Sequence, residues 1–226
     1  IIFGGTGFLG YHLAKKSLKK GWKVTSVSSK SPKKSRCLSK VKYLKCDIVN
    51  KKKLKKLIKN NFSYVVNLSG YVDHSNKVKT YQSHYIGCKN IADIFLKLKP
   101  KSFIQIGSSL EYGKANSPQR ENVKSKPVSV YAKSKYLSTK YLLSIYKKNN
   151  FPVTVLRLYQ AYGPGQDLNR LIPIVINSCL KKEKFPCSEG KQFRDFIYVT
   201  DVISAIMKSL QSTKAKGQII NVGSGK

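Results

Sequence analysis

A glycine-rich loop at the start of the chain constrains the fold more than any other feature. Residues 1–3 form a short apolar run, and residues 4–10 then carry the spacing Gly-x-Gly-x-x-Gly. An amphipathic helix is predicted directly afterwards, over residues 7–20. Glycines in such a loop allow a tight turn, close approach of the backbone to a pyrophosphate, and close packing of the helix on the strand. The sequence therefore predicts a strand–turn–helix unit whose helix N-terminus binds phosphate groups.

Short apolar runs alternate with amphipathic stretches along the rest of the chain. We expect strands at residues 23–28, 42–44, 64–68, 102–107, 152–158, 193–198 and 219–222, and helices at 50–59, 80–99, 129–149, 171–180 and 200–210. Alternation of this kind indicates a parallel sheet with helices on both faces. The predicted fold class is α/β, a Rossmann-type doubly wound parallel sheet with a small C-terminal lobe.

The charge balance is unusual, because 44 Lys and Arg oppose 10 Asp and Glu and give a formal net charge of +34. The lysines run through every segment, and no helix-turn-helix, zinc-finger or aromatic RNA-binding signature accompanies them. We interpret them as a solvated surface and expect no nucleic acid partner. Binding of RNA through this charge is the remote alternative.

Cysteine usage and hydropathy exclude further classes. The five cysteines are odd in number and lack ligand spacing, so we expect neither disulfides nor a metal site, and we place the protein in the cytoplasm. No apolar run approaches the length of a membrane span, so we expect no membrane partner. The chain opens on a strand without an initiator Met and stops just after a strand, so we expect both ends to be trimmed.

The end of the second predicted strand bears on the choice of cofactor. An acidic residue there would bind the ribose 2′-hydroxyl of NAD(H). This chain instead has Ser28, Ser29 and Lys30, with Arg36 beyond. Hydroxyls and cations suit a 2′-phosphate, so the sequence favours NADP(H) over NAD(H). The alternative is that Lys30 is one more surface lysine.

A Tyr-x-x-x-Lys pair supplies candidate chemistry. Tyr131 and Lys135 share one face of the predicted helix over residues 129–149. A nearby ammonium favours the phenolate form of a tyrosine, which makes Tyr131 a candidate general acid or base. Chance pairs are common among 14 tyrosines and so many lysines. This pair is distinguished by its position, one loop after the strand that leads into residues 107–113.

With these motifs in place, the chain resembles the extended short-chain dehydrogenase/reductase family, in its nucleotide-sugar epimerase/dehydratase/reductase branch. The matching segments are the glycine loop and residues 46–48, 67–70, 107–113, 131–135, 156–165 and 194–202. The resemblance implies an NAD(P)-binding Rossmann domain over residues 1–160. Residues 161–226 would be mainly a substrate-binding lobe, interleaved with the last elements of the sheet. It also implies a homodimer and a nucleotide-sugar substrate.

The resemblance assigns roles to individual residues. Tyr131 would exchange a proton with the sugar oxygen while hydride passes between sugar and nicotinamide, and Lys135 would hold the nicotinamide ribose. Ser108 would hydrogen-bond the same sugar oxygen, with Ser109 as the alternative if the alignment shifts by one. Implied substrate contacts are Glu111, Asn169, Arg170 and Arg194. Arg194 would pair with phosphate, whereas Glu111 is equally well read as a structural or solvent-facing residue.

Predicted cofactor contacts come from five segments of the chain. They are Gly4, Gly5, Thr6, Gly7, Phe8, Leu9 and Gly10; Ser28, Ser29 and Lys30; Asp47 and Ile48; Leu68, Ser69 and Gly70; and Tyr131 and Lys135. The three histidines, His12, His74 and His84, lack ligand spacing, and we expect structural or surface roles for them.

Two departures from the family pattern bear on the reaction. Dehydratases of the family carry an Asp-Glu pair where this chain has Ser109 and Leu110, which disfavours 4,6-dehydration. The family's Asn in the segment after Arg157 is replaced by Gln160.

The favoured interpretation is an NAD(P)-dependent reductase of a nucleotide-linked 4-keto sugar. A nucleotide-sugar 4-epimerase ranks close behind it, and a non-catalytic nucleotide- or RNA-binding protein far behind.

Overall fold

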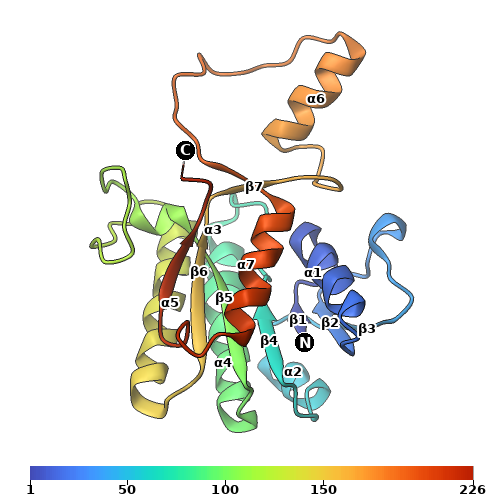
Figure 1. Ribbon diagram of the computed structural model, residues 1–226, viewed down its shortest axis with the longest axis vertical. Coiled ribbons are helices and arrows are strands. Elements are labelled where there is room, and N and C mark those ends of the chain that lie inside the picture. Colours follow the sequence, from blue (N-terminus) through green and yellow to red (C-terminus); the bar gives the residue numbers. More distant parts are fainter. Residues whose placement is uncertain (226) are drawn as a thin grey trace.

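A seven-stranded parallel sheet forms the centre of the computed structural model, which describes residues 1–225 (Figure 1). The strands are β1 (Ile2–Phe3), β2 (Val24–Ser28), β3 (Val41–Lys45), β4 (Tyr64–Asn67), β5 (Ser102–Ser108), β6 (Val153–Leu158) and β9 (Ile219–Val222). Their spatial order is β3-β2-β1-β4-β5-β6-β9, so the order reverses between β1 and β4. This is the doubly wound arrangement, and the predicted fold class is confirmed.

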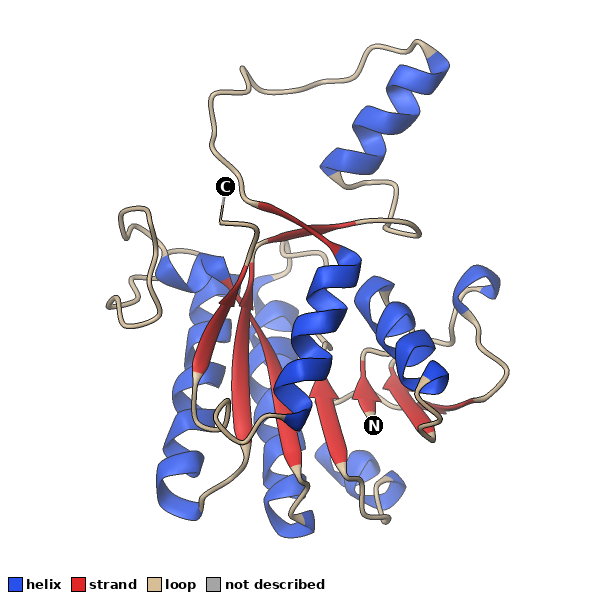
Figure 2. Cartoon of the chain, viewed as in Figure 1, coloured by secondary structure: helices blue, strands red, loops and turns tan. Residues whose placement is uncertain are grey.

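Helices cover both faces of the sheet (Figure 2). They are α1 (Phe8–Lys19), α2 (Lys51–Leu57), α3 (Lys77–Tyr81), α4 (Gly87–Leu98), α5 (Val130–Asn149) and α7 (Val199–Gln211). One core packs Leu54, Ile91 and Leu142 of α2, α4 and α5 against the sheet. The core on the opposite face contains Leu13 of α1 and Ile206 of α7. Burial of each such side chain stabilises the fold by about 1.5–3 kcal/mol.

Local sequence signals set the ends of the helix that carries the Tyr–Lys pair. Ser129 precedes α5, and its hydroxyl accepts a hydrogen bond from the Ala132 N–H at 3.1 Å. Asn150 follows the helix in the left-handed conformation, with φ of 52°. These are typical N-cap and C-cap residues. The cap places Tyr131 in the first turn of α5, at the end nearest the carboxyl ends of the strands.

An excursion leaves the main sheet after β6. β7 (Gln160–Tyr162) pairs in parallel with β8 (Phe196–Tyr198) in a separate two-stranded sheet. Between them the chain carries α6 (Leu171–Lys181), which projects beyond the carboxyl ends of the strands (orange in Figure 1). None of the α6 side chains is buried by the described residues. α7 and β9 then return to the main sheet, so the projecting part is limited to residues 163–195.

The length and apolar character of the helices bear on membrane insertion. Within residues 1–225 none of them combines the length and the apolar character that a membrane span requires.

Candidate active site

Most predicted site segments meet at the carboxyl edge of the sheet. The glycine loop follows β1, residues 68–70 follow β4, and Ser108 ends β5. β1 and β4 are neighbours at the point where the strand order reverses. In open α/β sheets the crevice at this point is the usual ligand-binding site.

The glycine loop is shaped for close approach. A Cβ atom on Gly10 would clash with the carbonyl oxygen of Gly4, so only glycine allows α1 to pack this tightly on the loop. Gly7, which has no side chain to cap the helix, precedes α1. The first N–H groups of α1 and its positive end therefore face the crevice without a side-chain cap, as anion binding requires. The Thr6 N–H reaches the Ser28 hydroxyl at 3.4 Å and ties the loop to β2.

The residues after β2 differ in solvent exposure and in their hydrogen-bond partners. Ser28 is buried, whereas Ser29 and Lys30 are exposed. Arg36 is buried and donates hydrogen bonds to the Gly165 carbonyl at 2.6 Å and to the Asp167 carboxylate at 2.8 Å. The Nη2 atom of Arg36 is therefore engaged by Gly165 and Asp167, whereas Lys30 is exposed.

Asp167 shows the electrostatic result of this contact. Burial alone would raise the pKa of its carboxyl group. The hydrogen bond and charge of Arg36, together with Lys33, hold that pKa below its usual value instead. The ion pair links the loop after β2 to the segment that enters α6.

Two further segments that the sequence predicts to contact a cofactor follow β3 and β4. Asp47 is exposed, and its carboxylate accepts a hydrogen bond from the Val49 N–H at 2.9 Å. The Ile48 side chain is buried against Gly87, so it packs in the core rather than at the surface. After β4, the Asn67 side-chain oxygen accepts a hydrogen bond from the Ser69 N–H at 3.1 Å, which fixes the path of the chain there.

Two of the predicted catalytic groups, Tyr131 and Lys135, lie side by side near the start of α5, and Ser108 ends the strand that holds the lysine. Ser108 is the last residue of β5, and its hydroxyl accepts a hydrogen bond from the Leu110 N–H at 3.2 Å. Lys135 is buried, and its ammonium donates to the Ile106 carbonyl of β5 at 2.7 Å. That ammonium lies 5.9 Å from the centre of the half-buried Tyr131 ring. The strand thus fixes the lysine directly beside the tyrosine.

Glu111 corrects one of the predicted substrate contacts. The 3₁₀ turn Ser109–Tyr112 directs this side chain inward, and it is 0% exposed. Its carboxylate accepts hydrogen bonds from the Ser108 N–H at 2.9 Å, the Thr139 hydroxyl at 2.8 Å and the Arg157 guanidinium at 3.0 Å. Arg157 is 1% exposed and packs over the Tyr112 ring. Glu111 is therefore a structural residue that joins β5, α5 and β6.

Two histidines that the sequence did not connect with the site flank Tyr131. The His74 and Tyr131 rings are stacked, with centres 4.1 Å apart and planes at 20°. His84 meets the same tyrosine ring edge to face, with centres 4.8 Å apart. Their spacing in sequence predicts neither contact. The one available signal was that both follow β4, at the same edge of the sheet as the start of α5.

Comparison with known proteins identifies the family. The sequence model of the NAD dependent epimerase/dehydratase family matches residues 1–223. The chain belongs to this family. It is 30% identical to a UDP-N-acetyl-alpha-D-glucosaminuronate decarboxylase of Bacillus cytotoxicus over 99% of this chain and 74% of the relative. It is 27% identical to a putative UDP-glucose 4-epimerase of Methanocaldococcus jannaschii over 100% of this chain and 77% of the relative.

Solved structures agree with the epimerase/dehydratase assignment. The dTDP-glucose 4,6-dehydratase of Bacillus anthracis, in complex with NAD, superposes with a TM-score of 0.89 at 25% identity, over 100% of this chain and 75% of that one. The UDP-glucose 4-epimerase of Thermotoga maritima, with UDP-glucose, has a TM-score of 0.93 at 24% identity over 100% and 76%, which shows the shared fold. The predicted resemblance is confirmed. The relatives are nucleotide-sugar enzymes of several reaction types, which supports an enzyme of this class.

The remaining substrate residues divide between two cavities at the carboxyl edge of this epimerase/dehydratase fold. A cavity of about 990 Å³ is lined by Ser109, Leu110 and the exposed Arg194, among others. Asn169 lines a separate cavity of about 490 Å³ together with Arg36 and Asp167. Arg170 is exposed and immediately precedes α6. The structure therefore brings Ser109 and Arg194 to one cavity and places Asn169 at another.

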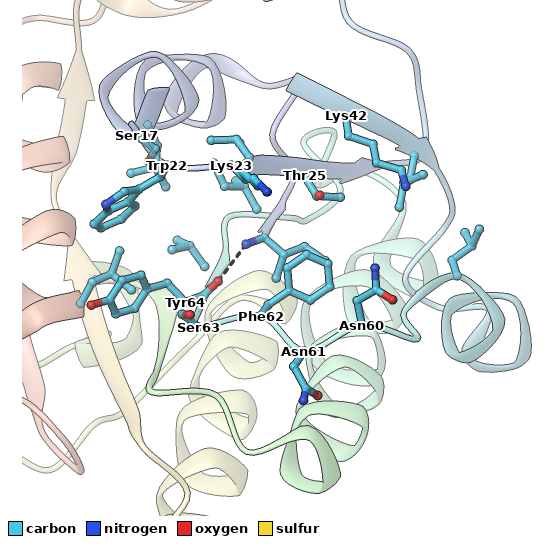
Figure 3. A pocket seen from close by; sticks show the side chains of 18 residues that line it. Ser17, Trp22, Lys23, Thr25, Lys42, Asn60, Asn61, Phe62, Ser63 and Tyr64 are labelled. Carbon is cyan, nitrogen blue, oxygen red and sulfur yellow. Dashed lines mark hydrogen bonds between the residues drawn. The ribbon is translucent and has the colours of Figure 1, made fainter. Parts of the chain in front are cut away.

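A third cavity lies at the opposite, amino edge of the strands (Figure 3). Its volume is about 560 Å³, and its lining includes Trp22, Phe62 and Tyr64. The dashed line in Figure 3 is the hydrogen bond from the Ile1 ammonium to the Tyr64 carbonyl, at 2.8 Å. The residues that line this cavity include none of the predicted site residues. It is therefore separate from the catalytic edge of the family fold.

Proposed function

We propose that this member of the family is an NAD(P)-dependent reductase of a nucleotide-linked 4-keto sugar. The observation that carries the proposal is the pairing of Tyr131 with Lys135 beside β5, the strand that Ser108 ends, at the same carboxyl edge of the sheet as the glycine loop. A hydroxyl, a phenol and a fixed ammonium are the groups that proton delivery to a substrate oxygen requires.

A dinucleotide would bind at the glycine loop, because the N-terminus of α1 carries no side-chain cap there and can bind a pyrophosphate. A nicotinamide cofactor bound there supplies the hydride. The Tyr131 hydroxyl gives its proton to the sugar oxygen as that oxygen gains charge. Lys135, held by the Ile106 carbonyl, places a positive charge beside the phenolate that remains. The Ser108 hydroxyl stabilises the same oxygen by hydrogen bonding.

Reduction is favoured over dehydration by the residues that follow Ser108. Elimination of water needs an acid–base pair next to the sugar, and family dehydratases carry Asp-Glu there. This chain has Ser109 and Leu110, and Leu110 is 52% exposed and lines the 990 Å³ cavity. An apolar side chain at that place transfers no proton.

A 4-epimerase is the second candidate. It uses the same three residues to oxidise and then reduce one carbon, and it is supported by the relationship to the putative epimerase of M. jannaschii. An epimerase retains its cofactor through purification and shows no net turnover of it. A reductase consumes NADPH with each cycle.

The test uses purified protein, NADPH and a panel of nucleotide-linked 4-keto-6-deoxy sugars. We expect loss of NADPH absorbance, and Tyr131→Phe should lower kcat by about 10²–10⁴-fold with the cofactor Kd unchanged. Tyr136→Phe is a matched control, because Lys140 lies 5.7 Å from the Tyr136 ring in the same helix and the same spacing. An absence of NADPH consumption across the panel contradicts reduction. Sugar interconversion with co-purified cofactor establishes the epimerase.

We also propose a preference for NADP(H), supported by Ser28, Ser29 and Lys30 and by the lack of an acidic residue at the end of β2. Because Arg36 is buried and paired with Asp167, the exposed Lys30 is the cation that this proposal depends on. Lys30→Ala should weaken NADPH binding by about tenfold and leave NADH binding unchanged. Lys34→Ala, in the same loop, is the control. Tighter binding of NADH than of NADPH by the unmodified protein rules the preference out.

Partners and assembly follow from the same family reading. We propose that Arg194 pairs with a phosphate of the nucleotide sugar, a role that its exposed position in the 990 Å³ cavity allows.

We further propose a homodimer formed through α4 and α5, in the reducing cytoplasm that five free thiols suit. Light scattering on a size-exclusion column measures the mass, and a monomer would contradict the dimer.

A further inference from the structure

Tyr131 lies within a cluster of aromatic rings drawn from three segments of the chain. Its face is covered by His74, from the loop between β4 and α3, and its edge by His84, from the π turn Gln82–Ile86. The two imidazoles also approach each other, with centres 5.9 Å apart. Such pairs are worth about 0.5–1.5 kcal/mol each beyond the area they bury, which is enough to select one orientation of a half-buried ring.

The two histidines differ in how firmly they are held. His84 is buried, its Nε2 lies 3.1 Å from the Tyr71 carbonyl, and a Cβ atom on Gly70 would clash with its ring. His74 is exposed, its ring contacts Tyr131 and His84, and it also hydrogen-bonds the Tyr71 backbone. The buried His84 ring is therefore held in place by the core. The exposed His74 ring can move away from Tyr131 without disturbing that core.

The charges around His74 are predominantly positive. Lys135 of α5 and Arg170 at the start of α6 face it, and Asp73 on its own loop opposes them. Partial desolvation of the stacked ring, and then the charges of Arg170 and Lys135, lower the pKa of His74 below its usual value although part of the side chain is exposed. Burial and then Lys135 lower the pKa of His84 to about 3. Both rings are therefore neutral at neutral pH.

We propose that His74 is a positioning residue for the proton donor Tyr131, whose ring it holds against His84 by neutral stacking, and that protonation of His74 releases that ring. The proposal rests on the proposed function for Tyr131 as proton donor. An imidazolium gains cation–π attraction to a tyrosine face. Here Lys135 and Arg170 repel it, and the lowered pKa means that the surroundings disfavour the charged form overall. The stack is therefore complete above the pKa of His74 and is lost as the pH falls through it.

The structural arm of the test needs no substrate. Protein labelled with ¹³C-tyrosine gives ring signals, and the Tyr131 signal is the one missing in Tyr131→Phe. Stacking should move its ring protons upfield by the ring current of His74. We expect the shift to disappear in His74→Ala and to persist in His74→Phe. It should be unchanged in Lys77→Ala, an exposed neighbour in the same segment.

The kinetic arm separates positioning from binding. His74→Ala should lower kcat by about three- to tenfold, the loss expected for one aromatic contact, with KM unchanged. His74→Phe should restore kcat, because it keeps a ring on Tyr131. It should also remove the acid-side fall in kcat that the unmodified enzyme shows below the pKa of His74, because phenylalanine does not titrate.

Three results would overturn the proposal. The first is a Tyr131 ring shift that is unaffected by His74→Ala. The second is a rise in KM with kcat unchanged, which makes His74 a substrate contact. The third is an acid-side fall in kcat that persists unaltered in His74→Phe. If no nucleotide sugar is turned over while His74→Ala abolishes the ring shift, the proposed reductase function fails and the contact between His74 and Tyr131 stands.

Discussion

The main sheet and the excursion over residues 163–195 are built by different means. In the main sheet and the turn after β5, even charged side chains are buried. Arg157 is 1% exposed and Glu111 is 0% exposed. In the excursion, large apolar side chains face solvent, and Leu180 is 77% exposed and Phe193 98%. The groups that would move a proton are therefore positioned by a packed core. Within the described residues, the helix of the segment proposed to contact the substrate has no fully buried side chain.

Polar contacts, rather than a core, attach the two ends of the excursion. At its start, the His12 ring nitrogen lies 2.8 Å from the Pro164 carbonyl, and Arg36 pairs with Asp167. At its end, the Asp195 carboxylate accepts hydrogen bonds from the N–H groups of Ser224 and Gly225 at 2.7 and 2.9 Å. Between these anchors, α6 has no side chain that the described residues bury.

The largest expected effect follows loss of the buried ion pair. Arg157→Met should lower the free energy of unfolding by about 3–5 kcal/mol, because Glu111 would keep a buried charge without its cation. Urea denaturation followed by circular dichroism measures the change. Lys191→Met, which removes the exposed pair with Glu189, should change stability by less than about 1 kcal/mol. Equal effects of the two substitutions would contradict the contrast.

A matched pair of leucines compares the two regions directly. Leu142 on α5 is 0% exposed, so Leu142→Ala should cost about 2–5 kcal/mol of unfolding free energy through the cavity it leaves. Leu180→Ala on α6 should change it by no more than about 0.5 kcal/mol. Thermal or urea unfolding of both variants supplies the comparison. A large loss in Leu180→Ala would mean that α6 packs against protein in solution.

The smallest effect concerns the anchor at Asp167. The pKa of this carboxyl group is lowered in the folded protein, so its contribution is present above the unfolded-state value of about 4 and is lost as the pH falls. Asp167→Asn should reduce stability at neutral pH by less than about 1 kcal/mol, because the pair is partly exposed. The difference should close below about pH 4. A difference that widens in acid would show that Arg36 is not the partner that matters.

Much of the sheet was predictable because its signals are local. Residues 219–222 were predicted as a strand and form β9, and residues 129–149 were predicted as a helix and form α5 from Val130. The glycine loop and the Tyr131–Lys135 spacing each fit a single short motif with its own physical reason. Apolar periodicity and caps specify such elements without help from distant residues.

The unpredicted features depend on distant contacts or on short elements. β7 has three residues and exists because it pairs with β8, which lies beyond α6. One continuous helix was predicted over residues 80–99, but the π turn Gln82–Ile86 interrupts it and changes the phase of its faces. Arg36 and Asp167 are 131 residues apart.

Two features of the site depend on distant residues in the same way. The structural role of Glu111, one of the alternatives that the sequence left open, is selected by Arg157 beside it. His74 is exposed, as a surface role predicts, and its contact with Tyr131 appears only in the fold.

The turn that follows β5 limits how the Ser108 hydroxyl can form hydrogen bonds. The Ser108 oxygen already accepts a hydrogen bond from the Leu110 N–H. With one lone pair occupied in this way, the hydroxyl is better suited to donate its hydrogen than to accept another. The turn after β5 therefore fixes the Ser108 oxygen and leaves its hydrogen available to an acceptor at the carboxyl edge of the sheet.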